Sequence, residues 1–273
     1  MWWSATVTIR LPRLPMQSPA AISFGVSAEP RLASCLCVTE DRPAFLPWLL
    51  WNYAKQDYRP RELVVVDSSG EPLTVPDDPS VTVVRCPPGT NVARKRNLAV
   101  AAARGKLITW FDDDDWQHPR KLSILAAALG DDGVLAGPTR SWFVDLERGR
   151  ARAHAGGRSI LFNGLAARRT ALDGVRFDER RARAADTAWL GAVRNHARCT
   201  PRIVPHVLSW WLCHDGNLSN PAARYVFPSP LSAVRDAVGE FDWGDTDDQL
   251  ARLRIRRSEA VTSADADSPR RSS

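Results

Sequence analysis

Four consecutive aspartates at residues 112–115 stand at the end of a short apolar segment, residues 107–111. That segment is rich in β-branched and aromatic side chains, which is typical of a buried strand. Ligands of α/β sheets bind beyond the carboxyl ends of strands, so the carboxylates are expected beside a binding crevice. Crowded carboxylates need a cation or many hydrogen bonds, and oxygen ligands suit Mg²⁺ or Mn²⁺ bound to substrate phosphates. The alternative is a solvated acidic turn ahead of a helix that begins at Pro119.

The segments before the aspartates alternate between strand-like and helix-like patterns. Strands are predicted at residues 34–39, 62–67, 81–85 and 107–111, and helices at 43–55 and 91–104, with Gly105 ending the second helix. Strands that alternate with helices pair in parallel through right-handed crossovers. The sequence therefore predicts an α/β fold with a mostly parallel central sheet flanked by helices.

The second half of the chain is less regular. We expect helices from Pro119 to about Gly130 and at 185–194, and strands at 134–136, 141–145, 159–162, 203–207 and 209–212. The arginine-rich segment 148–183 is predicted to be a mobile loop around its short strand, either a lid over substrate or simply a basic loop. Arg94 and Lys95 are expected on a solvated helix face.

Composition narrows the class of protein. The chain has 273 residues, 44% of them hydrophobic, and a formal net charge of +6, which is compatible with anionic partners. The basic residues are dispersed, so nucleic acid is not an expected partner. No apolar run approaches the roughly 18 residues of a membrane span, so at most peripheral membrane association is expected.

The cysteines are odd in number and form no CxxC pair, which predicts reduced thiols in a cytoplasmic protein. They are Cys35, Cys37, Cys86, Cys199 and Cys213. Met1 and Met16 both remain candidate starts.

Four short motifs together resemble a family 2 glycosyltransferase with the GT-A nucleotide-sugar-binding fold. The strongest runs from Ala93-Arg94-Lys95-Arg96-Asn97 through Gly105-Lys106-Leu107-Ile108 to Asp112–Asp115. The weaker ones are Thr39-Glu40-Asp41-Arg42, then Gln56-Asp57-Tyr58 with residues 62–67, and finally His214-Asp215-Gly216-Asn217. Their order and spacing match those of the family over about residues 34–217.

The resemblance implies roles for individual residues. The donor sugar nucleotide would be bound by Thr39, Asp67, Arg96, Asn97, Asp112 and Asp113. Asp114 and His214 would hold Mn²⁺ or Mg²⁺, and Asp115 and Asn217 would support the site. For residues 215–217 the alternative is a simple turn. Asp186 matches the position of the catalytic base, and its alternative role is to cap the helix that follows.

This sequence departs from the family pattern at two places. Ser68 and Ser69 follow Asp67, where the family usually has a second acid, and this bears on the recognition of uridine. Ala185 precedes Asp186, where the family has glutamate. The resemblance still favours a UDP-sugar as donor and leaves the acceptor unknown.

The implied reaction is displacement at an anomeric carbon, with inversion and with a nucleoside diphosphate as leaving group. Residues 31–118 would form the nucleotide-binding half and residues 119–220 the acceptor half of a domain spanning 31–220. A flexible arm at 1–30, a helical extension at 221–256 and a disordered tail at 257–273 would flank it. The alternatives are a catalytically degenerate nucleotide- or glycan-binding protein and a sugar nucleotidyltransferase. The latter class should carry a glycine-rich loop after the first strand, and residues 39–43 contain no glycine.

Overall fold

The computed structural model describes residues 31–181, 184–214, 226–238 and 243–252. The predicted arm at 1–30, the tail at 257–273 and Asn217 lie outside these residues. Within them, no helix has the length and hydropathy to span a bilayer.

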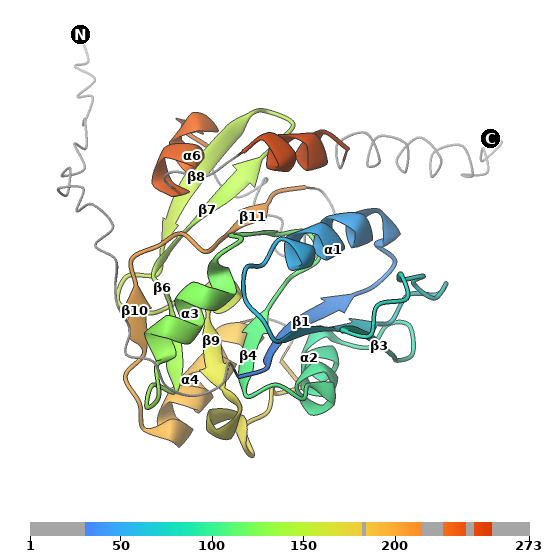
Figure 1. Ribbon diagram of the computed structural model, residues 1–273, viewed down its shortest axis with the longest axis vertical. Coiled ribbons are helices and arrows are strands. Elements are labelled where there is room, and N and C mark those ends of the chain that lie inside the picture. Colours follow the sequence, from blue (N-terminus) through green and yellow to red (C-terminus); the bar gives the residue numbers. More distant parts are fainter. Residues whose placement is uncertain (1–30, 182–183, 215–225, 239–242, 253–273) are drawn as a thin grey trace, which may run out of the picture.

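A seven-stranded sheet forms the centre of the molecule, in the order β10-β6-β9-β4-β1-β2-β3 (Figure 1). Its strands are β1 (Ala33–Thr39), β2 (Arg61–Asp67), β3 (Val81–Arg85), β4 (Leu107–Trp110), β6 (Leu135–Pro138), β9 (Ala166–Arg168) and β10 (Arg202–Val204). Strands β4, β1, β2 and β3 are parallel neighbours, whereas β9 runs antiparallel to β4 and β6. The predicted mostly parallel α/β sheet is confirmed.

Helices cover both faces of this sheet. They are α1 (Leu46–Ala54), which follows the 3₁₀ turn η1 (Pro43–Phe45), α2 (Val92–Ala102), α3 (Lys121–Leu129) and α4 (Ala185–Ala197). Because side chains alternate along a strand, Leu36 of β1 packs in the same cluster as α2 and α4, while Cys35 packs in the cluster of α1 and α3. All five cysteines are free.

A second sheet of five strands was not predicted as a unit. Its order is β12-β8-β7-β11-β5, and its strands are β5 (Trp116–Gln117), β7 (Arg140–Asp145), β8 (Arg150–Ala155), β11 (Ser209–Leu212) and β12 (Ser229–Pro230). Helix α6 (Ser232–Val238) packs against it in a third apolar cluster. In the predicted helical extension the structure places β12, α6 and a helix at 244–252.

The arginine-rich segment 148–183 is more ordered than predicted. Residues 150–155 form β8, which pairs with β7 along its whole length, so the prediction of a mobile loop is wrong there. The predicted strand at 159–162 is also wrong. That stretch is a turn leading into the 3₁₀ turn η2 (Phe162–Gly164), and the strand at this point of the chain is β9. A second 3₁₀ turn, η3 (Arg169–Leu172), follows β9.

Gly105 serves a different purpose from the predicted helix end. Helix α2 already ends at Ala102, with Ala103 as its C-cap. A Cβ on Gly105 would lie 2.5 Å from Ser34 Oγ and 2.7 Å from the carbonyl oxygen of Leu32. Glycine is needed because the chain passes this close to β1 before entering β4.

Candidate active site

The carboxyl ends of β1 and β4 bring Thr39 and the aspartates together. Thr39 Oγ1 donates a hydrogen bond of 2.6 Å to Asp113 Oδ2. Both residues are buried, and burial raises the pKa of Asp113 to about 7 despite the opposing charge of Arg42. The two residues, predicted separately as donor ligands, thus form one unit at the sheet edge.

Arg42 belongs to the site, although no role for it was predicted from the sequence. Its Nη1 lies 2.9 Å from Asp113 Oδ1, and its Nη2 forms an ion pair with Asp114 Oδ2. Nη2 also lies 3.0 Å from Nε2 of His214, which follows β11. In the sequence, Arg42 is marked only by its place in the segment Thr39-Glu40-Asp41-Arg42, which resembles a family motif.

Asp114 and His214, the predicted metal ligands, face each other. His214 Nε2 and Asp114 Oδ2 lie 3.0 Å apart. Burial alone would raise the pKa of Asp114, but the hydrogen bond from His214 and the charge of Arg42 outweigh it and lower the pKa to about 2. Asp114 is therefore ionised at neutral pH, which is the form that a cation would bind.

These two residues fit part of a divalent metal site. Ligands about 2.1 Å from an octahedral ion are separated by about 3 Å along each edge, which matches the Asp114–His214 separation. No cluster of three acidic, histidine or cysteine side chains suited to a metal occurs in the described part of the chain. Mg²⁺ commonly takes one or two protein ligands and completes its shell with phosphates and water, so two ligands suffice if the donor supplies the rest.

Asp115 points into the protein interior. Asn163 Nδ2 donates to Asp115 Oδ2 at 3.3 Å, and Trp48 Nε1 donates to the Asp115 carbonyl oxygen at 3.1 Å. Burial holds the pKa of Asp115 well above its ordinary value. The supporting role predicted for Asp115 stays a prediction.

Lys121 is a buried cation beneath the aspartates that the sequence analysis missed. It has no exposed surface, and its ammonium donates three bonds of 2.7 Å. The acceptors are the carbonyl oxygens of Trp110 and Asn163 and the side chain of Gln117. Burial lowers its pKa to about 7, although three donated bonds require the protonated form. Lys121 ties β4, β5 and η2 together under the loop of aspartates.

Arg96 links the aspartates to the predicted catalytic base. Its guanidinium forms an ion pair with Asp186 and lies 4.4 Å from the ring centre of Phe162. Burial lowers the pKa of Arg96, while the nearby charge of Asp112 opposes this. Burial in turn raises the pKa of Asp112, which Arg96 opposes. Arg96 thus stands between Asp112 and Asp186 on an aromatic platform.

Asp186 is not the helix cap that was considered as its alternative role. Helix α4 begins at Ala185, and the N-cap is Ala184, which has a left-handed backbone with φ of 54°. Asp186 lies in the first turn, where a negative charge interacts favourably with the helix dipole. Its side chain is 40% exposed, so it remains accessible to a second substrate.

Asn97 and Lys95 have different surroundings from those predicted. Asn97 Nδ2 donates to the carbonyl oxygen of Phe177 and to Glu179, and Asn97 Oδ1 accepts from the backbone of Phe177. These contacts hold the loop before α4 against α2. Lys95 is 3% exposed rather than solvated, and its Nζ lies 2.8 Å from Glu40 Oε2 and 2.9 Å from Ser68 Oγ. The prediction for Lys95 is wrong because the ends of β1 and β2 close over it.

Asp67 lies at the end of β2, fully buried. Its carboxylate pairs with Arg85 and accepts the backbone N–H groups of Ser69 and Leu73. Burial would raise its pKa, but these hydrogen bonds lower it below the ordinary value. Asp67 thereby fixes the start of the loop after β2.

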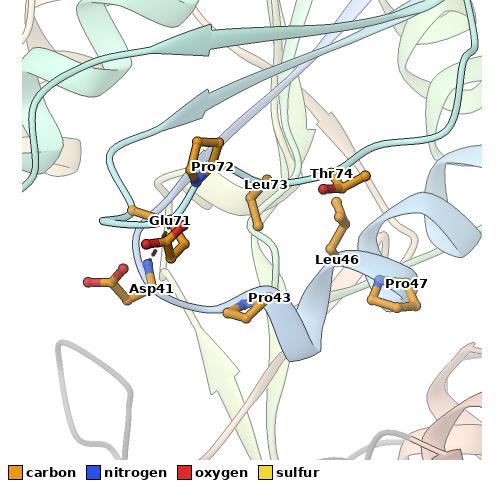
Figure 2. Close-up of a pocket in the computed structure, with 9 residues that line it drawn as sticks. Asp41, Pro43, Leu46, Pro47, Glu71, Pro72, Leu73 and Thr74 are labelled. Atoms are coloured by element: carbon orange, nitrogen blue, oxygen red, sulfur yellow. Dashed lines mark hydrogen bonds between the residues drawn. The ribbon is translucent and has the colours of Figure 1, made fainter.

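That loop forms one wall of a pocket of about 420 Å³. Figure 2 shows Leu73 from the loop and Leu46 from α1 on opposite sides of it. The lining residues are Asp41, Pro43, Leu46, Pro47, Ser69, Glu71, Pro72, Leu73 and Thr74. Its walls combine apolar side chains with a few polar groups, as is usual for small-molecule sites.

Comparison with known sequences agrees with this geometry. Residues 34–178, more than half of the chain, match the family described as Glycosyl transferase family 2. The chain belongs to this family. Over 80 residues it is 35% identical to WcaA of Escherichia coli (strain K12), whose name assigns it to colanic acid biosynthesis as a glycosyl transferase. This match covers 27% of the present chain and 29% of WcaA.

Solved structures confirm the GT-A fold of this family member. The mannosyltransferase PcManGT from Pyrobaculum calidifontis, in complex with GDP-Man and Mn²⁺, aligns with a TM-score of 0.54 at 16% identity, over 89% of this chain and 77% of that one. S. aureus TarS 1-349 in complex with UDP-GlcNAc aligns with a TM-score of 0.51 at 17% identity, over 71% and 61% of the two chains. The chain therefore spans less than two thirds of TarS 1-349.

Proposed function

We propose that this family 2 member transfers a sugar from a nucleoside diphosphate sugar to an acceptor hydroxyl, with inversion at the anomeric carbon. One observation carries the proposal. Thr39, Asp113, Asp114 and His214, from three separate parts of the chain, form a connected network of hydrogen bonds with Arg42 at the carboxyl ends of β1 and β4. Ligands of α/β sheets bind at this edge.

The donor would lie across this edge of the sheet. The pocket between α1 and the loop after β2 would take the base, and the network around Asp113 would lie toward the ribose and diphosphate. Asp67 would act by holding the pocket wall rather than by direct contact, because it is fully buried and already pairs with Arg85. Donors of this type are present in the structures of PcManGT and TarS.

Asp114 and His214 would hold Mn²⁺ or Mg²⁺ together with the donor phosphates. When bound, the ion would offset the negative charge that develops on the departing diphosphate. The low pKa of Asp114 keeps its carboxylate ionised for this purpose. Asp115, Asn163 and Lys121 would hold the loop that carries it.

Asp186 would accept the proton of the attacking hydroxyl. A general base must be ionised and within reach of the acceptor, and the Arg96 guanidinium beside the half-exposed Asp186 favours the ionised form. Attack from the face opposite the diphosphate gives inversion.

Free thiols are typical of proteins in a reducing compartment, which supports a cytoplasmic location.

The proposal is tested by thermal shift with UDP, GDP, dTDP and CDP, each with and without Mn²⁺. A ligand that binds only the folded protein raises the Tm through mass action. One nucleotide should give a shift that requires the metal, and this nucleotide names the base of the donor. Its sugar conjugates should then release nucleoside diphosphate on incubation with the protein. Binding without release over a panel of sugars and acceptors would instead favour a nucleotide-binding protein without transferase activity.

A further inference from the structure

The guanidinium of Arg42 is held on several sides. It pairs with Asp113 and Asp114, lies 3.0 Å from His214 Nε2, and stacks over the Phe45 ring at 4.7 Å from its centre. Its side chain is only 25% exposed. These contacts place the positive charge of Arg42 inside the aspartate cluster.

The atoms that Arg42 contacts are the ones that a metal would need. Asp114 Oδ2 and His214 Nε2 are the two proposed ligand atoms, and Arg42 Nη2 interacts with both. A divalent cation bound to these atoms would stand within about 4 Å of the guanidinium. At that distance the two positive groups repel strongly, even with the effective dielectric constant of about 20 that applies to protein sites. Arg42 in this rotamer and the metal therefore exclude each other.

The backbone around Arg42 is held by hydrogen bonds, so the Arg42 side chain has to move if a metal is to bind. The Asp41 N–H donates to Ser69 Oγ at 2.7 Å, and Asp41 Oδ1 accepts from the Gly70 N–H at 2.9 Å. On the other side, the Phe45 N–H donates to the Arg42 carbonyl oxygen at 3.1 Å. A change of rotamer removes the guanidinium without moving the loop.

We infer that Arg42 is an internal competitor of the divalent cation: it neutralises Asp113 and Asp114 in the free protein and must leave Asp114 and His214 for the metal to bind. The inference rests on the metal assignment in the proposed function. Metal would then bind weakly alone and more tightly with the nucleoside diphosphate, because the phosphates supply further ligands and offset the charge of the displaced guanidinium.

The test is Mn²⁺ affinity measured without nucleotide, from the free-ion signal in electron paramagnetic resonance. Arg42→Gln should bind Mn²⁺ about tenfold more tightly than the wild type, since one charge-assisted hydrogen bond no longer competes. Arg42→Lys retains the charge but loses the forked geometry, and should fall between the two. Arg202→Gln breaks another arginine–aspartate pair, with Asp132 in the turn after α3, and should behave like the wild type.

Two further results separate the inference from the proposed function. The gain in Arg42→Gln should vanish when Asp114→Asn is added, because the freed ligand is then absent. Equal or weaker Mn²⁺ affinity in a folded Arg42→Gln protein, with Asp114-dependent binding in the wild type, overturns the inference and leaves the function standing. Absence of Mn²⁺ binding in every variant, with or without nucleoside diphosphate, overturns both. Circular dichroism confirms folding, and if Arg42→Gln fails to fold, Arg42→Lys decides by the same comparison.

Discussion

Arg96 of α2 pairs with Asp186 in the first turn of α4, while its guanidinium lies over the ring of Phe162. The pair joins the nucleotide-binding part of the sheet to the helix that carries the proposed base. Arg96 also lies near enough to Asp112 for their charges to shift each other's pKa. Through Arg96, the position of Asp186 depends on the strand that ends in the aspartates.

Asp186→Asn should lower kcat by about 10²- to 10⁴-fold, the usual contribution of a general base. The KM for the donor and the Tm should change little, because the side chain is 40% exposed and an amide can still bond to Arg96. Steady-state kinetics with the donor found in the nucleotide screen measure both parameters. Asp178→Asn, which removes a similarly half-exposed carboxylate paired with Arg180 in the preceding loop, is the control. Turnover close to wild type would remove Asp186 as the base.

Asp114→Asn should abolish the metal-dependent part of nucleotide binding. The substitution removes an ionised oxygen that faces His214, and a neutral amide is a poor ligand for a hard cation. Calorimetric titration of the nucleotide with and without Mn²⁺ measures the effect. Asp145→Asn is the control. It alters another buried aspartate, which ends β7 and pairs with Arg148, and it should retain the metal dependence. An unchanged response to Mn²⁺ in Asp114→Asn would contradict the ligand assignment.

Lys121→Met should destabilise the protein by about 2–4 kcal/mol, because three buried acceptors lose their donor. Methionine fills a similar volume, so the loss reflects hydrogen bonds and charge rather than a cavity. Urea denaturation gives the free energy of unfolding. Lys106→Met, at an exposed position before β4, should lie within about 0.5 kcal/mol of the wild type. Equal stabilities for the two variants would show that Lys121 does not hold the loop.

Stability should depend on pH through His118. Burial, with the charges of His206 and Arg120, lowers the pKa of His118 to about 4, and its Nδ1 accepts the Arg120 N–H at 3.0 Å. Between about pH 4 and 6.5 the unfolded chain binds a proton that the folded chain does not, so this contribution to stability rises with pH and is lost as pH falls.

His118→Asn provides the comparison. Asparagine can still accept the N–H two residues ahead but does not titrate. The free energy of unfolding of the wild type, minus that of the variant, should therefore increase as pH rises from about 4 to 6.5, by at most about 1.4 kcal/mol per pH unit. The difference isolates His118 from Asp113, whose raised pKa acts in the opposite direction over much of this range. Parallel curves would contradict the assignment.

Much of the central sheet could be predicted because its signals are local. Strands β1, β2, β3 and β4 appear within one residue of their predicted bounds. In β1, β2 and β4 nearly every residue is buried, as apolar runs predict, and in the edge strand β3 the β-branched residues gave the signal. The second sheet could not be predicted in the same way. In β8 alanines alternate with arginines and a histidine, and of its six residues only Ala151 is buried, so no apolar face identifies a strand before its pairing with β7 is known.

The sequence by itself determined which residues stand at strand ends: Thr39, Asp67 and the aspartates at 112–115 follow directly from the apolar runs before them. Only the tertiary structure decided their partners. Arg42 meets His214 across 172 positions of sequence, and Asn163 meets Asp115 across 48. The helical pattern does not show whether Lys121 faces solvent or the core. In the structure its ammonium donates to acceptors on three separate elements. The physical reason is that burial and strand periodicity depend on near neighbours, whereas the pairing of buried charges depends on which distant segments the fold packs together.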